Sequence, residues 1–151
     1  MMIEERRRPR CRRCGWISYG NPVPAVAAVI VRGGRVLLTL RGRPPYQDTW
    51  DLPGGFIEAD ETPEAALARE LREELDIRRF RRGRLIGFFP DRYERGGLPI
   101  ISIVYRVTPE SGRMTPGDDV AAARWFPLTN LPYRDIAFPA MRAALRAWVK
   151  R

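Results

Sequence analysis

The stretch LPGGFIEADETPEAALARELREELDI, residues 52–77, carries the most regular pattern in this chain of 151 residues. Within it, Thr62 can cap a helix and Pro63 suits the first helical position. We therefore expect a helix over residues 63–75. One stripe of this helix is apolar and would pack against a core, as expected for an amphipathic helix; it consists of Leu67, Leu71 and Leu75.

The neighbouring stripe of the same helix is acidic. At about 100° per residue, three carboxylates fall within roughly a 100° arc; they belong to Glu70, Glu73 and Glu74. Such crowding costs roughly a few tenths of a kcal/mol per pair in solvent, and more when the pair is partly buried. A divalent cation would remove that cost, whereas a solvated surface face would tolerate it. From these residues alone, both interpretations stay open.

The chain contains no histidine. This excludes Ser-His and Cys-His nucleophilic mechanisms, a histidine base and histidine-ligated zinc. Acid–base or metal chemistry must then use carboxylates, which favour hard cations such as Mg²⁺ or Mn²⁺.

Fixed spacing extends the acidic face into a longer motif. From Gly55, five residues lead to Glu61 and seven more lead to Arg69, after which residues 69–77 read RELREELDI. The pattern resembles the Nudix box, which is Gly, five residues, Glu, seven residues, then Arg-Glu-aliphatic-x-Glu-Glu-x-Gly-aliphatic. Only the last glycine differs, because Asp76 stands there. Asp can adopt the left-handed backbone expected at that position at a cost on the order of 1 kcal/mol, so we expect lower stability and unchanged chemistry.

The resemblance implies a metal site in the box and covers most of residues 21–151. Glu73 and Glu74 are then the first expected ligands, Glu70 is a further ligand or a base, and Gly55 offers its carbonyl. Arg69 is expected to pair with Glu73 and orient it. Mg²⁺, or Mn²⁺, would hold the pyrophosphate oxygens, offset their charge and orient or deprotonate the attacking water.

Other acidic residues outside the helix have separate expected roles. In this family the general base often lies on a later loop, where Asp118 and Asp119 are candidates and Asp119 is better placed. A turn-forming role in Pro-Gly-Asp-Asp is equally open for Asp119. Glu58 is a further candidate acid on the loop, while Glu61 is expected to fasten the loop to the helix.

The remaining sequence predicts one α/β domain, since the length suits a single core. An apolar run at residues 25–31, the turn Gly33-Gly34 and residues 36–40 predict a buried strand and its hairpin partner. By resemblance, we expect an α/β/α sandwich with a mixed, largely antiparallel sheet and one helix on each face. The other expected elements are a strand and turn at residues 50–57, strands at 85–89, 100–107 and 122–126, and a helix at 137–149.

The chain is basic, with a formal net charge of +9, and Lys150 is its only lysine among 27 basic residues. Because the arginines are scattered, we favour a coding or thermal preference over nucleic-acid binding. A positive surface would help to gather phosphorylated substrates. The longest apolar run, residues 25–31, is too short for a membrane span, and no signal peptide is recognisable. We therefore expect a cytoplasmic protein without a membrane partner.

Residues 1–20 are expected to form a basic head before a domain at residues 21–151. Cys11 and Cys14 in CRRCGW resemble a zinc knuckle, similar to half of the zinc ribbon of NADH pyrophosphatases. A closed zinc site needs four ligands and the chain supplies two, so no complete site is expected within one chain. We expect the pair to be vestigial; the alternative is a homodimer whose two chains share one four-sulfur site. The family's Ser-Gln-Pro-Trp-Pro-Phe-Pro segment of NADH-cleaving members is absent, which leaves NADH specificity without support.

The resemblance predicts a metal-dependent pyrophosphohydrolase. It would convert a nucleoside diphosphate linked to a group X into a nucleoside monophosphate and X-phosphate, with an ADP-ribose-like compound as the expected substrate. The alternative is a nucleotide-sensing or RNA-associated binding module with the same fold. The acidic helix face argues against this alternative, since a pure binder need not retain it.

Overall fold

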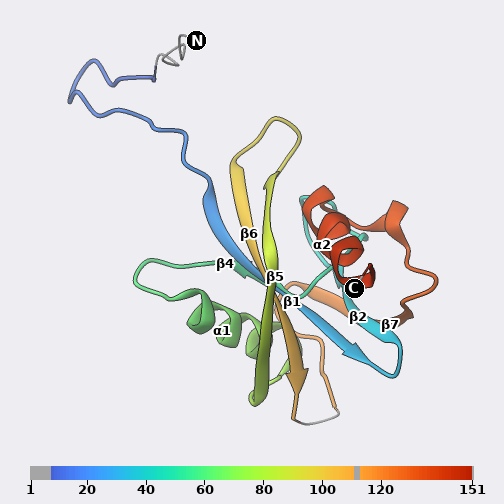
Figure 1. Cartoon of the computed structure of the whole chain (residues 1–151). Helices are drawn as coiled ribbons and strands as arrows, with labels where there is room; N and C mark the ends of the chain where they lie inside the picture. Colours follow the sequence, from blue (N-terminus) through green and yellow to red (C-terminus); the bar gives the residue numbers. More distant parts are fainter. Residues whose placement is uncertain (1–7, 111–112, 151) are drawn as a thin grey trace.

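The computed structural model describes residues 8–110 and 113–150 (Figure 1). Three short segments lie outside the described residues. They are residues 1–7 of the expected head, and residues 111–112 and 151 of the expected domain. Strands within the described ranges are β1 (Val23–Arg32), β2 (Arg35–Arg41), β3 (Trp50–Asp51), β4 (Gly54–Phe56), β5 (Phe80–Arg92), β6 (Pro99–Pro109) and β7 (Val120–Pro127). The helices are α1 (Pro63–Leu75), η1 (Tyr133–Asp135) and α2 (Pro139–Val149). None of these helices combines the length and apolar character that crossing a membrane requires.

The strands form a mixed sheet with β1 at its centre. Its order is β3-β2-β1-β6-β5, with β4 also paired to β1 and β7 also paired to β2. The β1–β6 pairing is parallel, from Val23 opposite Ile100 to Ile30 opposite Val107, and the other pairings are antiparallel. This confirms the expected mixed, largely antiparallel sheet. Because β1 has neighbours on both edges and a helix over each face, its apolar run is continuous and lacks the alternation of a half-exposed strand.

Helix α1 begins and ends where its sequence predicts. The Thr62 hydroxyl accepts a hydrogen bond from the Ala65 N–H at 3.1 Å, and Pro63 follows in the first turn. The helix ends at Asp76, which has a left-handed backbone with φ 53° and donates its N–H to the Arg72 carbonyl at 3.0 Å. Asp76 therefore takes the conformation that the glycine of the box would take.

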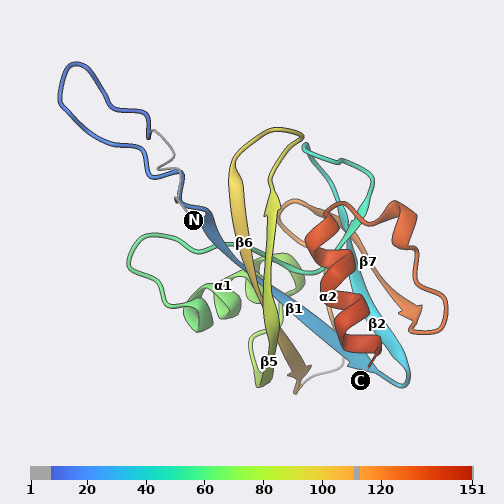
Figure 2. The ribbon, with the colours of Figure 1, turned by 45° about the horizontal axis from the view of Figure 1, so that its top comes forward.

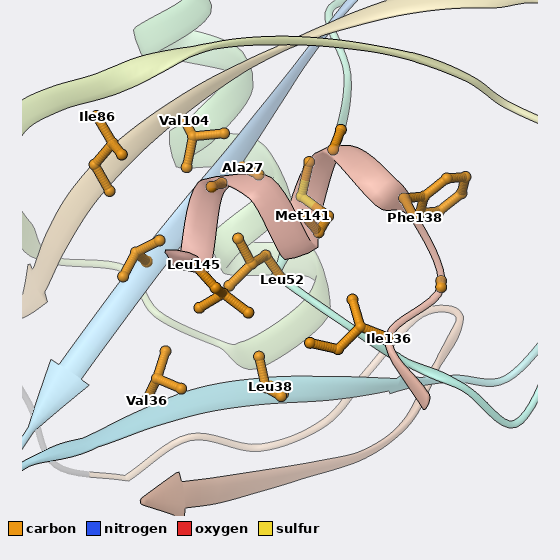
Figure 3. Close-up of a cluster of buried hydrophobic side chains, with 14 of the residues drawn as sticks. Ala27, Val36, Leu38, Leu52, Ile86, Val104, Ile136, Phe138, Met141 and Leu145 are labelled. Atoms are coloured by element: carbon orange, nitrogen blue, oxygen red, sulfur yellow. The ribbon is translucent and has the colours of Figure 1, made fainter. Parts of the chain in front are cut away.

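The two long helices lie on opposite faces of the sheet (Figures 1 and 2). Helix α1 buries its leucine stripe against one face, together with Val26, Ala28 and Ile30 of β1. Helix α2 covers the other face, where Met141 and Leu145 meet Ala27, Val36 and Leu38 of the strands (Figure 3). This arrangement confirms the α/β/α sandwich.

Several element boundaries differ from the predictions. The second helix begins at Pro139 and not at residue 137, because the Ala137 N–H bonds to the Trp50 carbonyl at 2.7 Å and proline occupies the first turn. Strand β5 extends well beyond residues 85–89, since its arginine-rich start still pairs with β6. The segment predicted at residues 50–57 divides into β3, which pairs with β2, and β4, which pairs with β1.

Candidate active site

A cavity of about 320 Å³ opens beside β4 and α1 and contains most of the predicted site residues. Gly55, Glu70, Glu74 and Asp119 line it, together with Glu58 and Asp118. These residues come from a short strand, a helix and two loops that are far apart in sequence. The fold thus brings together carboxylates from residues 58 to 119 around one space.

Glu74 is the most enclosed of these carboxylates. It is 7% exposed, and its Oε2 accepts a hydrogen bond from the Gly54 N–H at 2.9 Å. Gly54 has φ +147°, and a Cβ there would overlap the Val26 carbonyl, so only glycine brings its N–H this close. Burial raises the pKa of Glu74 well above its ordinary value, and the nearby carboxylates of Glu70 and Asp119 raise it further.

Glu70 lies one helical turn earlier and faces Gly55. A Cβ on Gly55 would overlap the Glu70 carboxylate, so the missing side chain makes room for that group. Burial raises the pKa of Glu70, although Arg69 acts in the opposite direction through a hydrogen bond. The Arg69 Nη1 donates to Glu70 Oε1 at 2.7 Å.

Arg69 forms hydrogen bonds to several parts of the box. Besides Glu70, it donates two hydrogen bonds to Glu61, at 2.8 and 3.0 Å, and one to the Phe56 carbonyl at 3.0 Å. The Arg69 bonds hold the pKa of Glu61 at about 2. Glu61 therefore joins the loop to the helix, as the sequence predicts, and does not line the cavity.

Glu73, which is expected as one of the first metal ligands, is more exposed than Glu70 and Glu74. Its side chain is 39% exposed, its Oε2 lies 3.3 Å from Arg69 Nη1, and its Oε1 lies 3.9 Å from Arg72 Nη2. The expected pairing of Arg69 with Glu73 is present. Neither residue is among those that line the cavity, whereas Glu70 and Glu74 both are.

The two candidate bases are held by a loop contact that the sequence did not reveal. Arg43 donates from Nε to Asp119 Oδ2 at 2.9 Å and from Nη2 to Asp118 Oδ1 at 3.4 Å. The Gly42 N–H also bonds to the Asp119 carbonyl at 2.7 Å. These bonds join the loop after β2 to the loop before β7 at the cavity.

A partly buried ion pair at the cavity was not predicted from the sequence. Arg41 and Asp51 line the cavity, and Arg41 Nη1 lies 3.3 Å from Asp51 Oδ2. Burial raises the pKa of Asp51 to about 7, despite the opposite effect of Arg41. The sequence held one signal for this pair, because the charged Asp51 lies in the short predicted strand directly before Leu52-Pro53-Gly54-Gly55. A charged residue is rarely buried without a partner, so its position indicated that an oppositely charged residue lies nearby.

The carboxylates suit a hard divalent cation, although no group of three potential ligands is already assembled in the described part of the chain. Glu70 and Glu74 each use one oxygen in the hydrogen bonds above. In residues 8–110 and 113–150, their other oxygens accept no hydrogen bond from the protein. The buried Glu74 and the partly buried Glu70 each have a raised pKa and a free oxygen, which matches the ligand chemistry of Mg²⁺.

The cysteine-containing head lies away from this site. Residues 8–20 extend from the start of β1, away from the sheet and both helices (Figures 1 and 2). Cys11 and Cys14 are exposed and do not form a disulfide. A tight hairpin holds them, because the Cys11 N–H bonds to the Trp16 carbonyl at 2.7 Å and the Gly15 N–H bonds to the Cys11 carbonyl at 2.9 Å.

Among curated proteins, the chain is similar to an ADP-ribose pyrophosphatase from Methanocaldococcus jannaschii. The two are 38% identical over 76% of this chain and 67% of that protein. An NAD-capped RNA hydrolase NudC from Deinococcus radiodurans is 30% identical over 90% of this chain, which spans 48% of that relative's length.

Among solved structures, a NUDIX hydrolase from Nitrosomonas europaea matches with a TM-score of 0.78 and 28% identity, over 95% of this chain and 78% of that one. A MutT NUDIX hydrolase from Burkholderia pseudomallei matches with a TM-score of 0.72 and 32% identity, over 84% of this chain and 98% of that one. The family model of the NUDIX domain matches residues 21–148, which include the box and every cavity-lining residue. The chain therefore belongs to the NUDIX domain family.

Proposed function

We propose that this chain hydrolyses a pyrophosphate bond in a nucleoside diphosphate joined to a second group. The products would be a nucleoside monophosphate and the phosphorylated second group. The observation that carries this proposal is that Glu70, Glu74 and Asp119 line one cavity with Gly55. An ADP-ribose-like compound is the proposed substrate class, because relatives are named ADP-ribose pyrophosphatase and NAD-capped RNA hydrolase.

Mg²⁺, or Mn²⁺ in its place, is the proposed cofactor. Glu70 and Glu74 would hold it through their free oxygens, the Gly55 carbonyl would add a ligand, and Glu73 would contribute from the exposed side. When bound, the cation neutralises pyrophosphate charge and increases the acidity of water. Gly54 keeps the Glu74 carboxylate in place through a hydrogen bond at 2.9 Å, and Arg69 does the same for Glu70 at 2.7 Å.

The remaining groups of the cavity would handle the proton and the phosphates. Asp119 is the proposed base: its Oδ2 is held by Arg43 at 2.9 Å, so its Oδ1 would accept the proton from the attacking water. The water oxygen forms a bond to one phosphorus, and the bond from that phosphorus to the bridging oxygen breaks. Arg41 and Arg43 supply positive charge on the same cavity for the substrate phosphates.

A substrate panel tests this proposal. The protein is incubated with Mg²⁺ and ADP-ribose, NADH, CTP or 8-oxo-dGTP, and the phosphate monoester products are measured. We expect AMP and ribose 5-phosphate from ADP-ribose, and a loss of at least roughly 100-fold in turnover for Glu70→Gln and Glu74→Gln, because each removes a charged ligand.

Glu94→Gln is the matched control, since Glu94 is exposed on the loop between β5 and β6 and does not line the cavity. Wild-type turnover in the two cavity variants would contradict the assignment. Nucleotide binding without hydrolysis of any substrate would favour the nucleotide-sensing or RNA-associated module instead.

The head carries a separate proposal. Cys11 and Cys14 supply two thiols, and we propose that they do not complete a zinc site within one chain. A homodimer that shares four sulfurs is the alternative.

A further inference from the structure

The cavity has an aromatic wall beside its carboxylates. Phe56, Tyr93 and Phe138 line it and form a connected group. The ring centroids of Phe56 and Tyr93 lie 5.1 Å apart, and those of Tyr93 and Phe138 lie 6.1 Å apart with nearly parallel planes at 19°. The three rings come from β4, from the loop after β5 and from the start of α2.

Small residues form the floor between the aromatic residues. Ser102 of β6 lies opposite Ala25 of β1, and Ala25 lies opposite Phe56 of β4. On its other side, Ser102 lies opposite Phe89 of β5. Paired residues in neighbouring strands point to the same face of a sheet. The row therefore has large aromatic residues at its ends and small residues at the centre, which leaves space above Ala25 and Ser102.

Ser102 is the one polar side chain in this row. It lines the cavity and is only 4% exposed. Among residues 8–110 and 113–150 its hydroxyl forms no hydrogen bond with the protein. No fully enclosed side-chain nitrogen or oxygen of these residues lacks a partner, so the Ser102 oxygen is not sealed inside the protein. The Ser102 hydroxyl is therefore open to the cavity that Ser102 lines, where it can donate to or accept from a ligand.

We propose that this part of the cavity binds the nucleobase of the substrate, with Ser102 as the residue that hydrogen-bonds the edge of the base. The inference rests on the proposed function and adds the specificity-determining group. The aromatic rings contact the face of a flat heterocycle, as aromatic side chains do with nucleic-acid bases. A serine hydroxyl can both donate and accept, so it serves a base edge that carries either kind of group.

The position of this subsite agrees with hydrolysis at the carboxylates. Phe56 follows Gly55 directly in the chain, so their Cα atoms are about 3.8 Å apart, and Gly55 faces the Glu70 carboxylate. A base against Phe56 thus places the attached ribose and phosphates toward Glu70 and Glu74. The cavity volume of about 320 Å³ lies within the usual range for small-ligand sites.

Binding of nucleoside monophosphates by calorimetry tests the inference without using turnover. The probes are AMP, GMP, CMP and UMP, with ribose 5-phosphate as the probe that lacks a base. We expect at least one nucleotide to bind more tightly than ribose 5-phosphate. Ser102→Ala should weaken that nucleotide by about 3- to 10-fold, the usual effect of one neutral hydrogen bond. Tyr93→Leu should weaken it by roughly 10-fold, through lost stacking. Neither variant should change the affinity for ribose 5-phosphate.

Two further variants keep the result interpretable. Ser102→Thr retains the hydroxyl and should recover part of the affinity, whereas Ser18→Ala removes a hydroxyl from the distant head and should change nothing. Equal affinity for all four nucleotides and ribose 5-phosphate, or an unchanged nucleotide affinity in Ser102→Ala, would overturn the inference. Hydrolysis that persists in wild type under either outcome would leave the proposed function standing, so the two failures are distinguishable.

Discussion

The burial of the charged Glu74 side chain lowers the stability of the folded protein, while the same side chain has a proposed role as a metal ligand in the site. Its carboxylate is buried, and burial raises its pKa well above the ordinary value. Glu74→Gln keeps an oxygen for the Gly54 N–H and removes the buried charge. In EDTA at neutral pH, we expect this variant to unfold at a higher temperature than wild type by roughly 2–4 °C for each ~1 kcal/mol gained. Its turnover in Mg²⁺ should fall by at least roughly 100-fold.

Thermal unfolding with EDTA checks the stability half of this prediction. Glu73→Gln is the matched control one residue away, and its unfolding temperature should be unchanged because the Glu73 side chain is 39% exposed. A Glu74→Gln protein that is less stable than wild type without metal would contradict the interpretation of Glu74 as a buried, uncompensated charge.

Helical spacing predicts which carboxylates share a face, but it does not predict how deeply each one is buried. Glu70, Glu73 and Glu74 share one stripe of the helix, yet Glu73 is exposed and Glu74 is enclosed. The difference arises because Gly54 and Gly55 of β4 lie against Glu74 and Glu70. Arg43 could not be predicted as the partner of Asp119. The two are 76 residues apart, and only the folded loops bring them together.

At the scale of single elements, α1 follows its sequence signals closely, since the cap, the proline and the apolar stripe are all local features. The strands are less predictable. The start of β5 is rich in arginine and is assigned to the sheet only by its pairing with β6. The junction of β3 and β4 depends on Gly54, whose φ of +147° and close contact with β1 are properties of the assembled sheet.

The left-handed end of α1 can be stabilised. Asp76 has φ 53°, and its ion pair with Arg78 at 2.8 Å is exposed and contributes little. Asp76→Gly should raise the free energy of unfolding by roughly 1 kcal/mol, because it removes the Cβ strain of a left-handed residue. Urea unfolding measures this change, and Asp76→Ala is the control, since alanine keeps the Cβ and loses the local polar side chain. Equal stability of the glycine and alanine variants would contradict the account of this helix end.

At the scale of the whole molecule, the buried carboxylates predict the pH dependence of the metal-free protein. The pKa of Asp51 is raised to about 7, and those of Glu70 and Glu74 are also raised, so the folded state binds more protons than the unfolded state above pH 4. Stability is then greatest at low pH and is lost as pH rises through the folded pKa values. We expect the free energy of unfolding in EDTA to fall between about pH 5 and 8.

Two features of the chain keep other groups from obscuring the predicted change in stability between about pH 5 and 8. The chain has no histidine, and the pKa of Glu61 is lowered to about 2, so the stability that Glu61 adds is lost only in stronger acid. Mg²⁺ should weaken or reverse the trend, because it binds the deprotonated carboxylates of the folded state. Urea unfolding at several pH values, with EDTA and with Mg²⁺, measures both slopes. A rise in stability with pH in EDTA would be inconsistent with the burial of Asp51 and Glu74.

The head and the domain should behave independently in solution. Because residues 8–20 extend away from the sheet and both helices and do not line the cavity, replacing both Cys11 and Cys14 with serine should leave turnover nearly unchanged. Metal analysis of the chelator-washed protein, together with its mass in solution, tests the zinc expectation. We expect no tightly bound zinc. One zinc per two chains would select the shared dimer site, and one per chain would refute both versions.

The central claim is that water attacks a phosphorus atom of a pyrophosphate, and oxygen labelling tests it most directly. ADP-ribose, or the best substrate of the panel, is hydrolysed in ¹⁸O-water with Mg²⁺, and the products are analysed by mass spectrometry. We expect a single ¹⁸O atom in the phosphate of one of the two phosphorylated products, and at least roughly 100-fold slower formation of that product with Glu74→Gln. A label found only in a product without phosphate would show that another bond is cleaved and would contradict the mechanism.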